Sequence, residues 1–174
     1  MTNVLLVGLM GTGKTTIADL IAKETGWPHL DNDVLVRRSA GAALEELRRQ
    51  VGGDGLHDAE SAALHEVLRS PPPWVAGAAA SVVMPAQNRA AIRLSGAFVV
   101  WLQAHAETLA ERISEQESRP WVTVDPVGVL TAMAKERDPL FASISDMVVN
   151  VEDVTDEMAA ALIVAALKER ERHR

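Results

Sequence analysis

A short glycine-rich segment at residues 8–15, GLMGTGKT, constrains the fold of this chain more than any other feature. It matches the pattern G-x-x-x-x-G-K-[ST], whose glycines let the backbone turn tightly and present several N–H groups to phosphate oxygens. The apolar residues 3–7 predict a buried strand before it, and helical spacing of apolar residues follows it as far as Gly26. We therefore predict a nucleotide-binding loop, in preference to a glycine-rich helix entry with an incidental lysine.

The residue types in this loop indicate what each of them would hold. We expect Lys14 to reach the β- and γ-phosphates, and the Thr15 hydroxyl to ligate Mg²⁺. The helix that begins near Gly13 would add the positive end of its dipole and its free N–H groups. The predicted nucleotide-binding residues of the loop are Gly11, Thr12, Gly13, Lys14, Thr15 and Thr16.

Strand-like and helical patterns alternate along the rest of the chain. Strands are expected at residues 3–7, 27–31, 74–76, 98–102 and 147–151, and helices at 17–25, 34–39, 44–50, 58–69, 85–94, 109–116, 127–135 and 155–170. Such alternation favours right-handed crossovers and a parallel sheet covered on both faces. We predict one α/β domain over residues 1–174, a three-layer α/β/α P-loop kinase fold with a five-stranded parallel sheet and a mobile lid. Ligands would bind beyond the carboxyl ends of its strands.

The composition limits the partners that we expect. Of the 174 residues 48% are hydrophobic, which is enough to bury a core, and the formal net charge is −7. This charge argues against nucleic acid and anionic membranes as the main partner. The apolar run before the loop is too short for a signal peptide or a membrane span, and a chain without cysteine forms neither disulfides nor thiolate metal sites. We expect a cytoplasmic monomer that acts on a small molecule.

Two carboxylates spaced by one residue, Asp31 and Asp33, follow the second predicted strand. If that strand lies beside the first, both carboxylates face the phosphate loop. One of them could then hold Mg²⁺, directly or through water, and the other could accept the proton of an attacking hydroxyl. The alternative is a solvated turn in which Asp33 caps the next helix. Because a phosphate loop is predicted nearby, we favour the functional interpretation.

The segment 117–126 lacks helical periodicity and contains two prolines, which suits a mobile lid over a phosphate site. Arg119 is its only basic residue, and lid closure would bring this charge to the phosphoryl group in the transition state. An ordinary surface loop with a solvated arginine fits the residue types equally well.

Three histidines, His29, His65 and His105, have no carboxylate or cysteine at the sequence spacings of metal ligands. We interpret all three as structural or surface residues.

Several motifs, in order over most of the chain, resemble those of the shikimate kinase family, which belongs to the nucleoside-monophosphate-kinase-like group of P-loop proteins. The segment GLMGTGKTT is similar to the family's opening motif, and HLDND is similar to its second-strand D-x-D. That likeness implies that Asp31 serves the metal ion and that Asp33 grips the substrate hydroxyls and acts as the base. Glu60 stands where the family has the glutamate of F-R-x-x-E.

Three arginines stand where the family has functional arginines. The segment SRPW at residues 118–121 resembles the R-P-L lid, which implies that Arg119 closes on the transferring phosphate. Arg112, seven residues earlier, matches the arginine that stacks on adenine. The segment RDPLF at residues 137–141 resembles R-x-P-L-Y, which implies that Arg137 binds a carboxylate of the acceptor. The lid and the Arg137 motif at these separations are more specific than the loop alone.

Two departures from the family fall in the acceptor half of the site. His57 replaces the carboxylate-binding arginine of F-R-x-x-E, and the family's triple glycine after the third strand appears as GAAA at residues 77–80. The loss of one charge-assisted contact costs about 1.5–3 kcal/mol, and added Cβ atoms would narrow the pocket. The predicted substrate-binding residues are Asp33, His57, Gly77 and Arg137.

The resemblance implies an ATP- and Mg²⁺-dependent kinase that transfers the γ-phosphate to a hydroxyl of a small carboxylated polyol. We expect Lys14, Asp33 and Arg119 to be its catalytic residues, Thr15 and Asp31 to serve the metal ion, and Arg112 to contact the nucleotide. One alternative is a kinase for a different hydroxylated acid or sugar-like metabolite. Another is a nucleotide-binding regulator without kinase activity.

Overall fold

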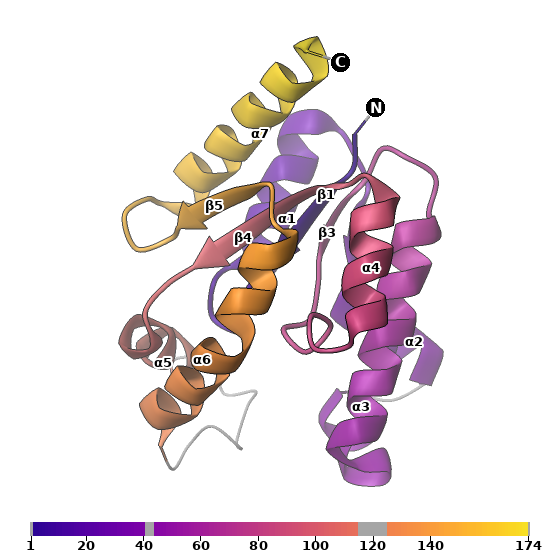
Figure 1. Ribbon diagram of the computed structural model, residues 1–174, viewed down its shortest axis with the longest axis vertical. Coiled ribbons are helices and arrows are strands. Elements are labelled where there is room, and N and C mark those ends of the chain that lie inside the picture. The colour runs from indigo at the N-terminus through magenta and orange to yellow at the C-terminus, as the bar shows by residue number, and fades with distance from the viewer. Residues whose placement is uncertain (1, 41–43, 115–124, 174) are drawn as a thin grey trace.

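Five parallel strands form one sheet in the computed structural model, which describes residues 2–40, 44–114 and 125–173. The strands are β1 (Val4–Val7), β2 (His29–Asp31), β3 (Val75–Gly77), β4 (Phe98–Gln103) and β5 (Met147–Asn150). Their order across the sheet is β2-β3-β1-β4-β5, with β1 at the centre. Figure 1 labels β3, β1, β4 and β5, which follow this order. All four residues of β1 are buried, as expected of a strand that is covered on both faces.

Helices cover both faces of the sheet in three layers (Figure 1). The described helices are α1 (Lys14–Thr25), α2 (Asn32–Ala40), α3 (Leu44–Arg69), α4 (Ala86–Ser95), α5 (Ala106–Ser114), α6 (Pro126–Ile144) and α7 (Asp156–Arg172). Alternate residues of β1 enter different cores: Leu5 packs with side chains from α2 to α6, and Leu6 packs with side chains of α1 and α7. This arrangement confirms the predicted three-layer α/β/α fold with five parallel strands.

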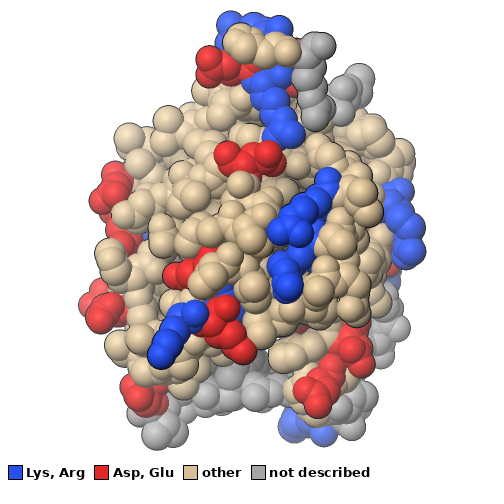
Figure 2. Space-filling view, in the orientation of Figure 1, with Lys and Arg blue, Asp and Glu red and all other residues tan. Residues whose placement is uncertain are grey.

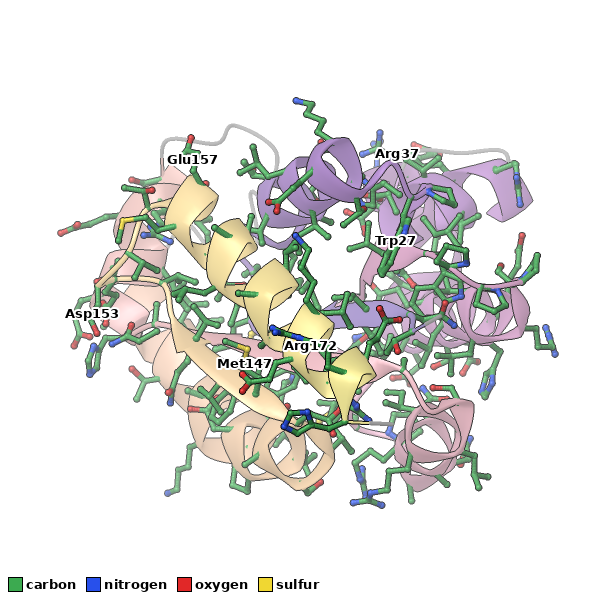
Figure 3. The ribbon with its side chains drawn as sticks, turned by 90° about the horizontal axis from the view of Figure 1, so that it is seen from above. Trp27, Arg37, Met147, Asp153, Glu157 and Arg172 are labelled. Atoms are coloured by element: carbon green, nitrogen blue, oxygen red, sulfur yellow. The ribbon has the colours of Figure 1, made fainter. Side chains whose placement is uncertain are left out.

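Helix α7 closes the face of the sheet that it shares with α1. Figure 3 shows α7 from above, with Glu157 at one end, Arg172 near the other, and Met147 of β5 packed against the same core. The backbone N–H of Thr2 donates a hydrogen bond to Glu171 Oε1 at 3.1 Å. The first described residues and the last helix therefore meet at one end of the molecule.

Local signals at helix ends act as predicted. Gly26 has φ 73° and its N–H donates to the carbonyl of Ala22 at 2.8 Å, which ends α1. Thr155 caps α7, because its side chain accepts a hydrogen bond from the backbone N–H of Met158 at 3.2 Å.

Two helices are longer than we predicted. Helix α6 continues through Pro139 to Ile144, because the face that carries Leu130, Arg137 and Phe141 is buried against the sheet. Helix α3 joins the predicted helices 44–50 and 58–69 across a break at Gly52, where φ is 74° and ψ is −176°. Burial of an apolar face outweighs the local breaker at Pro139, whereas the exposed Gly52 interrupts the helical backbone of α3.

The strand order does not meet the condition that we stated for Asp31 and Asp33, a second strand beside the first. Strand β3 lies between β2 and β1, so the second strand does not border the first. In the described part of the chain, no helix combines the length and the apolarity needed to cross a membrane.

Candidate active site at the phosphate loop

The loop between β1 and α1 needs its glycines, because its backbone approaches neighbouring residues closely and has positive φ angles. Gly8 has φ 144°, and a Cβ on it would lie 2.4 Å from the carbonyl oxygen of Leu102 in β4. Gly11 and Gly13 both have φ 82°, a left-handed conformation that favours glycine. The buried Thr12 hydroxyl donates to the carbonyl of Leu9 at 2.9 Å, so this side chain braces the loop from within. Any contact of Thr12 with a nucleotide would come from its backbone.

Lys14 begins α1 and lies along the loop. Its Nζ donates to the carbonyl oxygens of Gly8 at 3.0 Å and Leu9 at 2.8 Å. Gly77, at the end of β3, leaves room for it: a Cβ at this position would lie 3.3 Å from Lys14 Cβ. The structure thus shows Gly77 as a neighbour of the lysine, while its predicted contact with the acceptor stays a prediction.

Asp31 joins the end of β2 to the phosphate loop, although β2 is not a neighbour of β1. Its Oδ2 accepts a hydrogen bond from Thr15 Oγ1 at 3.2 Å, and its Oδ1 accepts one from the backbone N–H of Val34 at 3.0 Å. The alternative in which Asp33 caps the following helix is therefore wrong, because Asp31 is the cap of α2. Asp33 lies half-buried in the first turn of this helix.

The donor set around Thr15 and Asp31 fits Mg²⁺. A hydroxyl and a carboxylate meet at one point beside the loop, and Mg²⁺ prefers oxygen ligands while it keeps several waters and phosphate oxygens. Within residues 2–40, 44–114 and 125–173 no three His, Cys, Asp or Glu side chains gather as a metal cage. A protein cage of that kind is not what Mg²⁺ at a nucleotide phosphate requires.

Arg112, on α5, connects the loop to the segment after β5. Its guanidinium donates to the carbonyl oxygens of Gly11 at 3.4 Å and Val151 at 3.0 Å. The residue therefore lies next to the predicted nucleotide site, and its stacking on adenine stays a prediction. Thr16 lies in the first turn of α1, and its predicted contact with the nucleotide also stays a prediction. Arg119 and most of the predicted lid lie outside the described residues.

Arg137 is buried on α6, with 9% of its surface exposed. Its Nε has no hydrogen-bond partner among the described residues. Burial lowers the pKa of the Arg137 guanidinium, and the carboxylates of Glu136 and Glu60 act in the opposite direction. Glu136 Oε2 lies 4.0 Å from the Arg137 Nε, a distance that makes an ion pair but is too long for a hydrogen bond, so the guanidinium keeps a buried donor that would suit an anionic ligand.

Glu60, on α3, accepts a hydrogen bond from the hydroxyl of Ser81, which holds this carboxylate near Arg137. His57 lies exposed one turn earlier on α3. Of the alanines that replace the family's glycines, Ala78 is buried in the core, and Ala79 and Ala80 pack against it. The Cβ of Ala78 therefore fills the core and does not narrow a pocket.

Two histidines, His29 and His105, have carboxylate neighbours that the sequence spacing did not reveal, and His29 lies next to Asp31. His29 Nδ1 lies 2.6 Å from Asp19 Oδ1, and His29 Nε2 lies 4.0 Å from Asp31 Oδ2. These contacts are compatible with the interpretation of His29 as a structural residue. Asp19 comes four residues after Thr15 on the same helix face, and this spacing was the available signal.

Comparison with known proteins agrees with this geometry. The family model described as shikimate kinase matches residues 10–168. A shikimate kinase of Pseudomonas savastanoi pv. phaseolicola is 34% identical over 170 residues, which cover 97% of this chain and 98% of that protein. A shikimate kinase of Caulobacter vibrioides is 35% identical over 167 residues, which cover 95% and 82% respectively.

Solved structures show the same relationship. The shikimate kinase from Acinetobacter baumannii in complex with shikimate has a TM-score of 0.90 and 26% identity, and the match covers 98% of this chain and 94% of that one. A gluconokinase from Sinorhizobium meliloti, with a TM-score of 0.56 and 19% identity over 98% and 97% of the two chains, shares the fold alone. The loop, the Thr15–Asp31 contact and the full-length matches agree, and the chain belongs to the shikimate kinase family of P-loop kinases.

Proposed function

We propose that this protein transfers the γ-phosphate of ATP to a hydroxyl of shikimate, with Mg²⁺ as the metal ion. The buried guanidinium of Arg137, on the acceptor side of the site, is the observation that carries the proposal, because it calls for an anionic acceptor such as a carboxylate. The relatives named shikimate kinase support it, as does the high structural similarity to a shikimate complex.

Each half of the site would have its own task. Mg·ATP, when bound, supplies the phosphoryl group that is transferred. The loop N–H groups and Lys14 would hold the phosphates in place, while Thr15 and Asp31 would hold the metal ion. Arg137 would fix the acceptor through its carboxylate. The contribution of the protein is then positioning and charge stabilisation.

Asp33 would act on the acceptor hydroxyl from the first turn of α2. It would take the hydroxyl proton as the acceptor oxygen forms its bond to phosphorus and the bond between phosphorus and the ADP oxygen breaks. Its place next to Asp31 would bring metal ion and base together. Arg119 would bring positive charge to the transferring phosphoryl group, as the family resemblance implies.

For Asp33→Asn we expect kcat with shikimate to fall about 10²- to 10⁴-fold, because the amide cannot accept the proton. Binding of the ATP analogue AMPPNP should change less than about twofold, since the loop is untouched. Asp54→Asn, an exposed carboxylate on α3, is the matched control and should keep the wild-type kcat. Steady-state kinetics and calorimetry measure the two quantities, and an unchanged kcat in Asp33→Asn would contradict the role of this residue.

For His57→Arg we expect the KM for shikimate to fall about tenfold or more, with kcat nearly constant. The substitution restores a charged two-point donor to a carboxylate, and such a contact contributes about 1.5–3 kcal/mol. The exposed position of His57 on α3 lets the longer side chain enter without strain. A KM that stays the same or rises would show that this position does not face the acceptor.

The test of the function is ADP release coupled to a spectroscopic signal, first with Mg·ATP and shikimate, then with a panel of other hydroxylated acids and polyols. Shikimate-dependent turnover supports the proposal. Turnover with another acid alone would establish a kinase of changed specificity, which the replacement at His57 favours as the second candidate. Nucleotide binding without turnover on any acceptor would identify a regulator and contradict the proposal.

We further propose that the protein is a cytoplasmic monomer whose partner is this small molecule, without nucleic acid or membrane. The net charge of −7 supports this, and acidic and basic side chains are interspersed on the face in Figure 2. Large exposed apolar side chains of the described residues are scattered over α2, α4, β5 and α7: Val34, Leu94, Val148, Met158 and Leu162.

A further inference from the structure

The side chain of Asn88, in the first turn of α4, is fully buried and bonds to two other segments of the chain. Its Nδ2 donates to Ser61 Oγ, on α3, at 2.9 Å, and to the carbonyl oxygen of Val82 at 3.0 Å. Val82 lies in the connection between β3 and α4, residues 78–85, which we call the β3–α4 turn. The Asn88 Oδ1 lies 3.0 Å from His65 Nε2, one helical turn after Ser61. Helix α4 packs beside α3 (Figure 1), and this amide joins both helices to the β3–α4 turn.

The chemistry of these partners fixes the orientation of the Asn88 amide. A carbonyl oxygen only accepts hydrogen bonds, so the amide nitrogen, and not the amide oxygen, faces Val82. The amide oxygen then faces His65, whose Nε2 is the donor. Any rotation of this amide would leave buried polar groups without partners, which is costly. Asn88 therefore holds the β3–α4 turn at a fixed position on α3.

The two groups that the amide nitrogen joins are neighbours in sequence of a second bond between the same segments. Ser61 follows Glu60 on α3, and Val82 follows Ser81 in the β3–α4 turn. The buried hydroxyl of Ser81 donates a hydrogen bond to Glu60 Oε2. Asn88 thus sets the distance between α3 and the turn at the place where Ser81 holds the Glu60 carboxylate.

This carboxylate acts on the buried guanidinium at which we propose that the acceptor binds. Burial lowers the pKa of Arg137, and the negative charges of Glu136 and Glu60 raise it. Electrostatic interactions of a buried group depend strongly on distance, because little solvent screens them. A shift of the Glu60 carboxylate would therefore change how the guanidinium is held for an anion.

The two ends of the β3–α4 turn have anchors of their own. At its start the N–H of Ala78 donates to the carbonyl oxygen of Leu6, in β1, at 2.9 Å. Near its end the carbonyl oxygens of Val83 and Met84 accept hydrogen bonds from Arg89 Nη1 at 2.7 and 2.6 Å. Loss of the asparagine amide would consequently release the middle of the turn, where the serine lies, and leave the end next to β1 in place.

We propose that Asn88 is a positioning residue for the acceptor site: its amide clamps the β3–α4 turn to α3, so that Ser81 holds the Glu60 carboxylate in its place near Arg137. Asn88 acts through these residues and not by contact with the reacting atoms. The inference rests on the proposed function, because that function places the acceptor at Arg137. It requires that loss of the clamp weakens binding of the acceptor and leaves binding of the nucleotide unchanged.

The first test compares the KM for shikimate with the dissociation constant of AMPPNP. For Ser81→Ala we expect the KM to rise about tenfold, because a hydrogen bond to a charged group is lost. Asn88→Ala should raise it by a similar factor, and kcat and the AMPPNP constant should stay within about threefold of the wild type. Ser81→Thr keeps the hydroxyl and should restore most of the affinity for shikimate.

A double variant shows whether Asn88 acts through Ser81. If it does, Ser81→Ala combined with Asn88→Ala should have the KM of Ser81→Ala alone, because both substitutions remove the same constraint on Glu60. Two factors that multiply would show independent effects and would contradict the proposal.

Two further variants separate positioning from general loss of stability. Ser61→Ala removes one partner of the Asn88 amide with little change in volume, so it tests the clamp even if Asn88→Ala does not fold. Its KM for shikimate should rise about two- to fivefold, the effect of one neutral hydrogen bond. Asn3→Ala is the matched control, because Asn3 Oδ1 accepts from the N–H of Trp74 at 3.2 Å, just before the other end of β3. It should lower the melting temperature and keep the wild-type KM.

The second test observes the clamp without a substrate. The N–H groups of Val82 and Met84 are hydrogen-bonded within the β3–α4 turn, and that of Ala78 is bonded to β1. In Ser61→Ala and Asn88→Ala, hydrogen exchange at the first two should become about tenfold faster relative to Ala78, since the middle of the turn opens more easily. Exchange that is unchanged at both positions would overturn the proposal.

The failure of this inference can be told apart from the failure of the proposed function. If the wild-type protein turns over shikimate, and Ser61→Ala and Asn88→Ala keep its KM, only the role of Asn88 is wrong. If the wild-type protein turns over no acceptor, the proposed function is wrong and the positioning role fails with it.

Discussion

Replacement of Lys14 by methionine is expected to lower kcat by about 10²- to 10³-fold, the usual effect of removing one preorganised group that stabilises transition-state charge. Methionine keeps the unbranched stem that packs beside Gly77, so the fold should be preserved. It removes the ammonium group that donates hydrogen bonds to the carbonyl oxygens of Gly8 and Leu9 in the loop. The measurement is coupled ADP release at saturating Mg·ATP and shikimate.

The matched control for Lys14 is Lys23→Met, which removes the same charge near the other end of α1, where the side chain is exposed. This variant should keep the wild-type kcat within about twofold. Circular dichroism melts of both variants should agree with the wild type to within a few degrees. A Lys14→Met enzyme with a third or more of the wild-type kcat would show that the loop works without its lysine.

Replacement of Gly8 by alanine is expected to lower the free energy of unfolding by about 3 kcal/mol or more, the second large effect that the structure predicts. The new Cβ would lie 2.4 Å from the Leu102 carbonyl oxygen, so the loop or strand β4 must move. The backbone at φ 144° adds strain, and each such defect costs about 1–3 kcal/mol. Urea unfolding measures the loss, and AMPPNP binding should weaken with it because the loop is displaced.

Gly26→Ala separates these two causes. Gly26 also has a positive φ, of 73°, but a Cβ there would meet nothing within 4 Å. Its cost should be that of the left-handed conformation alone, about 1–2 kcal/mol. If Gly8→Ala and Gly26→Ala lowered the free energy of unfolding equally, the close contact with Leu102 would contribute nothing to the cost.

The parts of the fold that could be predicted depend on neighbours in sequence. Gly26 ends α1 and Thr155 caps α7 through bonds that span three or four residues, so the pattern of residue types suffices. The strand order could not be predicted in the same way, because nothing local to β2 says that β3 lies between it and β1. The continuation of α6 beyond Pro139 likewise depends on the burial of Phe141 against the sheet.

In the candidate site, too, the features built by neighbours in sequence could be predicted, and those built by contacts between distant segments could not. The loop could be predicted because a contiguous motif builds it, and Asp31 because it follows a strand that ends at the same edge of the sheet. Asp31 also caps α2, which the sequence did not predict: the alternative that we did not favour named Asp33 as the cap, since a pattern of two carboxylates does not say which one meets the N–H of Val34. The pair His29 and Asp19 was missed because it joins a strand to the helix before it across ten positions.

The layer formed by α1 and α7 has a consequence for how the protein is made. Leu6 in the first strand and Ile163 near the end of the chain belong to the same core, so this core cannot close until α7 has left the ribosome. During synthesis the apolar face of the sheet beside α1 is therefore exposed to chaperones and to other nascent chains. The opposite face, covered by helices α2 to α6, can form earlier. Folding on the ribosome would thus proceed one face at a time, and the addition of α7 would complete the core that contains Leu6 and Ile163.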